Sequence, residues 1–155
     1  MEEVIIMKKI HFLVITISVI LFFLSGCAGG VTTPSNDEIK VKSSINGYFS
    51  ALNDQNWNKA KSYCTFGSEQ YNETIQLENT VENYCFSYDD CRVVIAINPT
   101  ILDTWFNGPY FCCVYCHMND FSAFDGDYLN NTQSYIMYYH LEKVGNEWKL
   151  FEKHT

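Results

Sequence analysis

The stretch YFSALNDQNWNKA, residues 48–60, contains the end of one helix, a polar break and the start of a second helix. Apolar side chains lead into it at the spacing of one helical face: Val41, Ile45, Tyr48, Phe49 and Leu52. The run Asn53-Asp54-Gln55-Asn56 then interrupts the pattern, and Trp57 and Ala60 resume it. The stretch therefore predicts two successive helices joined by a short turn.

Further helix signals lie on both sides of this stretch. The tetrapeptide Ser35-Asn36-Asp37-Glu38 resembles a capping box, in which the first and last side chains each satisfy a free backbone N–H. Downstream, Leu77, Val81, Tyr84 and Cys85 repeat the helical spacing and predict a third helix.

The second half of the chain has the composition of β-strands. We expect strands over residues 92–97, 110–116, 134–144 and 147–153, with Asn98-Pro99 ending the first strand and Gly145-Asn146 forming a hairpin turn. Helices first and antiparallel strands afterwards predict an α+β domain, with N-terminal helices packed on one face of the sheet.

Two segments resemble the nuclear transport factor 2-like superfamily. Residues 48–60 are similar to its first helix, break and second helix, and YHLEKVGNEWKL, residues 139–150, is similar to its closing hairpin. The resemblance implies a curved antiparallel sheet wrapped around the first helix, a cystatin-like cone with a pocket, over residues 36–155. The superfamily contains exported lipoproteins as well as enzymes such as ketosteroid isomerase, and a fold alone transfers no function.

The first 26 residues have the pattern of a secretory signal peptide. Lys8 and Lys9 precede an apolar run from Ile10 to Leu24, and small residues follow. Leu24-Ser25-Gly26-Cys27 resembles the prokaryotic lipobox, which implies that Cys27 carries the lipid and that residues 27–35 are a tether. An uncleaved membrane-spanning helix is the alternative, and the small residues and cysteine at its end disfavour it. We expect an extracytoplasmic protein, lipid-anchored to the cell membrane.

Charge and composition limit the partners of the mature domain. The formal net charge is −8, and no cluster of lysine and arginine follows residue 27. This balance argues against nucleic acid as a partner. We expect two kinds of partner: the membrane, through the lipid on Cys27, and an unknown small molecule or envelope protein.

Seven cysteines are present, six of them after Cys27. An even number in an exported domain favours disulfides, and the candidates are Cys64, Cys85, Cys91, Cys112, Cys113 and Cys116. Cys113-Val114-Tyr115-Cys116-His117 also matches the pattern of covalent haem attachment, and the same residues could hold zinc, with Cys85 and Cys91 completing the site. Because the surrounding segment is predicted to be extended, the two cysteines would point to opposite faces, which disfavours haem.

A pocket in the predicted cone would be lined by a few polar and aromatic side chains. The candidates are Tyr48, Trp57, Asp103, Tyr138 and His140. No convergent catalytic set is visible, so we expect a non-catalytic binding or interaction module, with neither cofactor nor metal. A small-molecule isomerase or cyclase that uses a pocket acid or base is the alternative.

Overall fold

Three helices form where the sequence predicts them. In this computed structural model, which describes residues 35–87, 91–124 and 133–155, they are α2 (Asn36–Asn53), α3 (Trp57–Ser62) and α4 (Glu69–Phe86). They belong to one compact unit, Pro34–Thr155. The predicted signal peptide and, apart from Ser35, the tether lie outside the described residues.

Side-chain caps define where each helix begins. The hydroxyl of Ser35 accepts a hydrogen bond from the backbone N–H of Glu38 at 3.1 Å, as the capping-box pattern predicts. The Glu38 carboxylate, however, forms an ion pair with Lys42 at 2.7 Å, one turn further along α2. Asn56 and Ser68 cap α3 and α4 in the same way as Ser35 caps α2.

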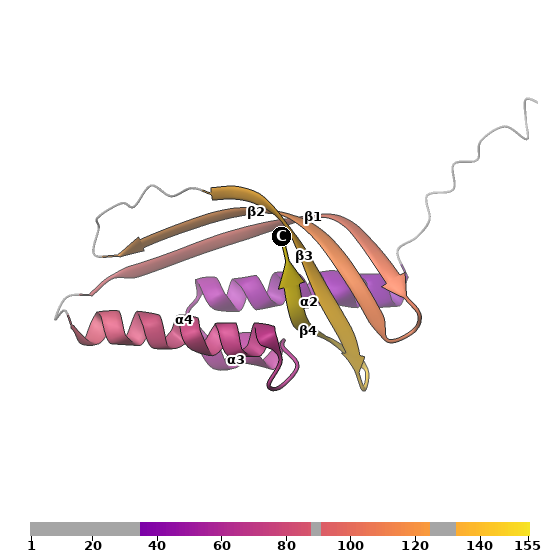
Figure 1. Ribbon diagram of the computed structural model, residues 1–155, viewed down its shortest axis with the longest axis horizontal. Coiled ribbons are helices and arrows are strands. Elements are labelled where there is room, and N and C mark those ends of the chain that lie inside the picture. Colours follow the sequence, from indigo (N-terminus) through magenta and orange to yellow (C-terminus); the bar gives the residue numbers. More distant parts are fainter. Residues whose placement is uncertain (1–34, 88–90, 125–132) are drawn as a thin grey trace, which may run out of the picture. The chain divides into compact units, whose positions relative to one another are not determined.

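Four antiparallel strands follow in the order β1-β2-β3-β4. They are β1 (Val93–Asn107), β2 (Phe111–Phe124), β3 (Gln133–Val144) and β4 (Glu147–His154). Figure 1 shows the sheet curling over α2, with α3 and α4 beside it. The predicted α+β class, with N-terminal helices packed on a curved antiparallel sheet, is thus confirmed.

The first strand continues through Asn98-Pro99, where the sequence predicts its end. Pro99 lies opposite Met118 of β2. Proline has no backbone N–H, so in a central strand, which bonds to a neighbour on each side, it would leave one hydrogen bond unmade. Because β1 is an edge strand, the missing donor faces away from the sheet and removes no ladder hydrogen bond.

A bulge in β4 reverses the direction of its last side chains. His140 pairs with Glu152, but Leu141 pairs with Leu150, so Phe151 is an extra residue on β4. One extra residue exchanges the two faces for everything beyond it. Trp148 and Leu150 therefore face the helices before the bulge, whereas Lys153 faces them after it.

The core lies between α2 and the inner face of the sheet. Val41 and Ile45 of α2, Val114 of β2, and Leu141 and Leu150 of the closing hairpin are fully buried. Gly145 forms the predicted hairpin turn with a φ of 63°, a left-handed conformation that glycine adopts without strain. Among residues 35–87, 91–124 and 133–155, no helix is long and apolar enough to cross a membrane.

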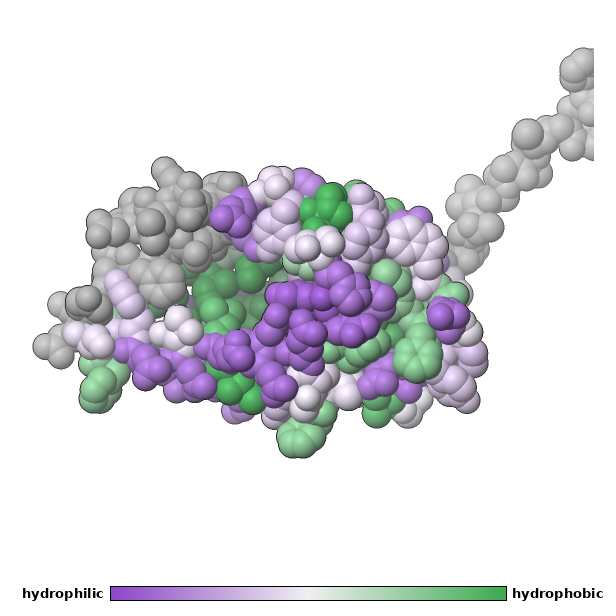
Figure 2. Space-filling view, in the orientation of Figure 1, coloured by the Kyte–Doolittle hydropathy of each residue, from purple (hydrophilic) through white to green (hydrophobic). Residues whose placement is uncertain are grey.

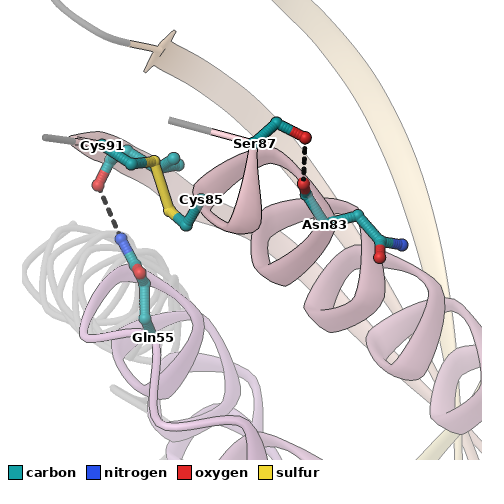
Figure 3. The surroundings of a disulfide bond; sticks show 6 residues. Gln55, Asn83, Cys85, Ser87 and Cys91 are labelled. Atoms are coloured by element: carbon teal, nitrogen blue, oxygen red, sulfur yellow. Dashed lines mark hydrogen bonds between the residues drawn. A yellow bond between two sulfur atoms is a disulfide. The ribbon is translucent and has the colours of Figure 1, made fainter. Parts of the chain in front are cut away.

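Two of the six candidate disulfide cysteines are bonded to each other. Cys85, near the end of α4, is bonded to Cys91, which precedes β1 (Figure 3). Beside it the side-chain amide of Gln55 donates a hydrogen bond to the backbone oxygen of Val93 at 2.6 Å. The disulfide and this hydrogen bond fasten α4 and the turn after α2 to the start of the sheet.

The other four cysteines of the domain are free thiols: Cys64, Cys112, Cys113 and Cys116. Pairing within β2 is excluded by strand geometry. Cys112 and Cys113 are neighbours that point to opposite faces, and Cys112 and Cys116 lie four residues apart, about 13 Å along a strand. A disulfide requires Cα atoms within about 7 Å.

Candidate functional site

A cavity of about 370 Å³ opens between α2, α4 and the inner face of the sheet. In Figure 2 a hollow with hydrophobic residues at its floor lies above the hydrophilic outer side of α4. The apolar part of its lining comes from α2, α4 and β1: Phe49, Leu52, Leu77 and Ile97. The polar part comes from α4 and from three strands, and includes Gln70, Glu73, Thr74, Asp120, Tyr135 and Lys153.

A buried hydrogen-bonded chain joins α2 to α4 in the wall of this cavity. The Thr74 hydroxyl donates its single proton to the backbone oxygen of Gln70 at 2.8 Å. The Tyr48 hydroxyl, 3.1 Å away, must therefore donate to Thr74 Oγ1, and it accepts from Gln70 Nε2 at 2.8 Å. Burial raises the pKa of Tyr48, so its hydroxyl keeps its proton at neutral pH.

The side-chain oxygen of Gln70 takes no part in this set of hydrogen bonds. The amide nitrogen of Gln70 donates hydrogen bonds both to the Tyr48 hydroxyl and, at 3.3 Å, to the Glu73 carboxylate. Among the described residues, the amide oxygen Oε1 is buried without a hydrogen-bond partner. A buried acceptor without a donor is costly, and a bound molecule can supply the donor.

Asp120 provides a second acceptor of the same kind on the opposite wall. Its Oδ2 accepts a hydrogen bond from the hydroxyl of Tyr135, and its Oδ1 is buried without a partner in the part of the chain that the structure describes. Burial, together with this hydrogen bond, raises the pKa of Tyr135. The hydroxyl therefore stays protonated and donates to the carboxylate at neutral pH.

An ion pair between α4 and β4 borders the cavity. Lys153 Nζ lies 2.7 Å from Glu73 Oε2, and both side chains are about one-third exposed. Lys153 reaches this position because the bulge at Phe151 turns it toward the helices. The pair neutralises charge at this edge of the cavity, so that Asp120 remains as the other carboxylate of the lining.

Of the predicted pocket residues, Tyr48 lines the cavity. Trp57, at the start of α3, instead packs against the core and contributes nothing to the lining. A second bulge lies in β1 between Ile101 and Asp103, and Asp103 is exposed just after it. Its carboxylate accepts a hydrogen bond from the backbone N–H of Thr104 at 2.7 Å. This bulge turns Asp103 away from the cavity.

Tyr138 and His140 point to the outer face of the sheet rather than into the pocket. Their neighbours Met137, Tyr139 and Leu141 are buried against the helices, and strand alternation sends the intervening residues outward. Tyr138 stacks there on Trp105, and His140 lies beside Cys113 and Glu152.

The cysteine-histidine motif follows the same alternation. Cys116 is fully buried on the inner face of β2, whereas Cys113 is half-buried on the outer face. Two sulfurs on opposite faces of one strand cannot attach to the same porphyrin or belong to the same zinc site.

Most of the polar cavity residues were missed by the sequence reasoning. Gln70 and Thr74 lie on α4 four residues apart, on the side that faces the core, and are 4% and 1% exposed. Polar residues at helical spacing, on the same face as Leu77 and Val81, were the available signal. Asp120 lies beyond residue 116, where the predicted strand ends, and Tyr135 pairs with Met118, which also lies beyond that end.

Comparison with known proteins places this fold. No protein-family model and no curated protein sequence matches the chain. Among solved structures, a proposed dehydratase of the nuclear transport factor 2-like family from Streptomyces avermitilis has a TM-score of 0.58 at 12% identity, covering 79% of this chain and 96% of its own.

Two further structures are similar. One is a nuclear transport factor 2-like protein of unknown function from Shewanella oneidensis, with a TM-score of 0.52, 14% identity and coverage of 74% of this chain and 94% of its own. The other is a ketosteroid isomerase-like protein from Erwinia carotovora, with a TM-score of 0.50, 12% identity and coverage of 77% and 95%. The chain therefore has the nuclear transport factor 2-like fold.

Proposed function

We propose that this protein is a lipid-anchored, exported binding module whose cavity holds a small molecule without transforming it. The observation that carries the proposal is the pair of buried acceptors Gln70 Oε1 and Asp120 Oδ1, which belong to two residues that line the cavity and which lack donors among the described residues. Folding leaves them unpaired at a free-energy cost, and a ligand that donates to both would remove that cost.

The lining suggests the chemical class of the ligand. Two acceptors require two donor groups such as hydroxyls or amines, and the carboxylate of Asp120 favours a neutral or cationic molecule. Phe49, Leu52 and Leu77 offer contact to an apolar body between those groups. The volume lies within the range of about 300–1,000 Å³ that is usual for small-molecule sites.

A matched pair of variants tests the binding proposal. Leu77→Trp fills the cavity, whereas Leu102→Trp places the same ring on an exposed position of β1. We expect hydroxylated and amine-bearing fragments, observed by ligand-detected NMR, to bind wild type and Leu102→Trp and to lose their signal in Leu77→Trp. Circular dichroism checks that both variants are folded. Fragments that bind all three proteins equally, or none of them, would contradict the proposal.

The anchoring part of the proposal rests on Leu24-Ser25-Gly26-Cys27. Lipid on this cysteine would hold the domain at the cell envelope, where the cavity meets extracytoplasmic solutes. We expect the mature protein to carry the mass of a diacylglyceryl group and to partition into detergent. Cys27→Ala should abolish both properties, whereas Cys113→Ala should leave them unchanged. A delipidated wild-type mass would contradict the anchor.

A second candidate function is proton-transfer catalysis, favoured by Asp120. Its carboxylate is paired with Tyr135 through one oxygen and has the other oxygen unpaired among the described residues, the arrangement that a general base needs. Two of the similar structures are a proposed dehydratase and a ketosteroid isomerase-like protein. We expect Asp120→Asn to retain the binding of neutral hydroxylated fragments, because its amide oxygen still accepts a hydrogen bond. Isomerisation of a bound unsaturated ketone, or loss of water from a bound β-hydroxyketone, that is catalysed by wild type and not by this variant would favour the enzyme over the binding module.

A further inference from the structure

Two histidines and a glutamate converge on the outer face of the sheet, on the side away from the cavity. His140 of β3 lies opposite Glu152 of β4, and His154 follows two residues later on the same face. Glu152 Oε1 is 3.9 Å from His140 Nδ1 and 3.8 Å from His154 Nε2. One donor atom from each of the three residues lies within 4.8 Å of the others.

The bulge at Phe151 creates this cluster. Without the extra residue, Glu152 and His154 would share a face with the buried Trp148 and Leu150. With it, both emerge beside His140, and the two imidazole rings approach to 4.5 Å between centroids. Bulges redirect side chains in this way next to functional sites.

The ring of His140 is held from its other side. Its Nε2 lies 3.9 Å from Cys113 Sγ on β2, and Phe151 packs edge-on against the ring. A proton on Nε2, directed to the sulfur, leaves the lone pair of Nδ1 facing Glu152 and His154. Metal-binding histidines usually donate their second N–H to a carboxylate, a carbonyl or water, which fixes the tautomer and the ring orientation, and the Cys113 sulfur occupies that position here.

We propose that His140, Glu152 and His154 form a binding site for a divalent zinc-type cation. Two imidazoles and one carboxylate are a ligand set that zinc uses, and three protein ligands leave one position for water or a further ligand. Donor atoms around tetrahedral zinc are about 3.4 Å apart, given bond lengths near 2.1 Å. The two carboxylate-to-imidazole separations are 3.8 and 3.9 Å, and all three donor atoms lie within 4.8 Å of one another, so the side chains must rotate to bring them onto one ion.

This site differs from the zinc site considered from sequence, because it excludes Cys116 and His117. His117 lies on β2, where its Nε2 is 2.7 Å from the hydroxyl of Ser134. His117→Ala is therefore a matched histidine control on the same face of the sheet. Cys113→Ser tests the sulfur as a positioning group rather than a ligand.

The experiment is equilibrium dialysis of the full chain, purified in detergent, against zinc chloride, with metal content measured per chain. We expect one zinc per chain with a micromolar or lower Kd. His140→Ala and His154→Ala should each weaken binding at least about tenfold, and His117→Ala should leave it unchanged. Cobalt substitution should give a tetrahedral visible spectrum without a thiolate charge-transfer band.

Three results would overturn the proposal. The first is a wild-type Kd weaker than about 100 µM, because such binding is too weak for a preorganised metal site. The second is zinc binding that survives both His140→Ala and His154→Ala. The third is a cobalt-thiolate band that Cys113→Ser removes, which would place the metal on the sulfur instead. The cavity and its fragment binding are independent of all three results.

Discussion

Gly47 lies where α2 meets the aromatic ring of Tyr63. A Cβ at this position would lie 2.5 Å from the Cζ and hydroxyl oxygen of that ring. Glycine inside a helix usually destabilises it by about 0.5–1 kcal/mol relative to alanine, so the residue at this position is explained by space rather than by helix propensity.

We expect Gly47→Ala to lower the free energy of unfolding by about 1–3 kcal/mol, because the ring of Tyr63 must move from a half-buried position. Urea unfolding measures the change. In a Tyr63→Ala background the obstacle is gone, and the same substitution should become neutral or stabilising. A Gly47→Ala protein more stable than wild type would show that the ring moves aside freely.

At the scale of elements, α2 is tied to the closing hairpin by Asp37. Its carboxylate accepts from Lys143 of β3 at 2.9 Å and from the indole nitrogen of Trp148 of β4 at 3.2 Å. These hydrogen bonds hold the pKa of Asp37 below its ordinary value of 3.8, and the one from Lys143 has the largest effect. Asp37 also places negative charge in the first turn of α2, where it is favourable.

The pKa of Asp37 predicts how its contribution to stability depends on pH. Because the folded state lowers this pKa, the unfolded state binds the proton more readily, and the stabilisation is present above the unfolded value near 3.8. It is lost as the pH falls through the lower, folded value. We expect Asp37→Asn to be less stable than wild type at pH 7 and equally stable at the acid end, as measured by urea unfolding.

The partner of Asp37 provides the control for this prediction. In a Lys143→Met background, the effect of Asp37→Asn at pH 7 should shrink, because the largest cause of the pKa shift is absent. A difference between Asp37→Asn and wild type that persists unchanged to the acid end would exclude this carboxylate as its source.

The strands show where sequence patterns stop being informative at this scale. Apolar runs located all four strands, but β1 extends ten residues beyond the predicted Ile97 to Asn107. Pro99 predicts the end of a strand only if that strand has neighbours on both sides. Its tolerance depends on the edge position of β1, which is a property of the sheet rather than of the segment.

At the scale of the whole molecule, packing determines the chemistry of the four free thiols. Burial raises the pKa of Cys64, Cys112 and Cys116 to about 12, and also raises that of Cys113. Cys113 alone among them is partly exposed. Since the thiolate is the reactive form, both access and ionisation favour Cys113 over the buried three.

We therefore expect iodoacetamide at pH 8 to modify the native Cys27→Ala protein once, at Cys113. In denaturant without reductant four cysteines should react, and two more, Cys85 and Cys91, only after reduction. Intact mass and peptide mapping measure these numbers. A native protein with no reactive thiol and three disulfides would contradict the structure and support the pairing expected from the even number of cysteines.

The sequence by itself determined the helices, the hairpin turn, the class of fold and the candidate anchor at Cys27. Each of these depends on neighbours within a few residues: apolar spacing, Ser35 as a cap, Gly145 in a turn, or a run before a cysteine. Local patterns suffice because the physical causes are local.

Only the tertiary structure decided which side chains meet. The bulge at Phe151 sends Lys153 to the cavity and Glu152 to the outer face, and strand alternation places His140 outside. Packing of α4 against α2 leaves Gln70 Oε1 buried without a hydrogen-bond partner among the described residues, which no periodicity in α4 predicts. A single residue of register exchanges the two faces of a strand, so the cavity and the histidine cluster depend on pairing between strands rather than on the sequence of either one.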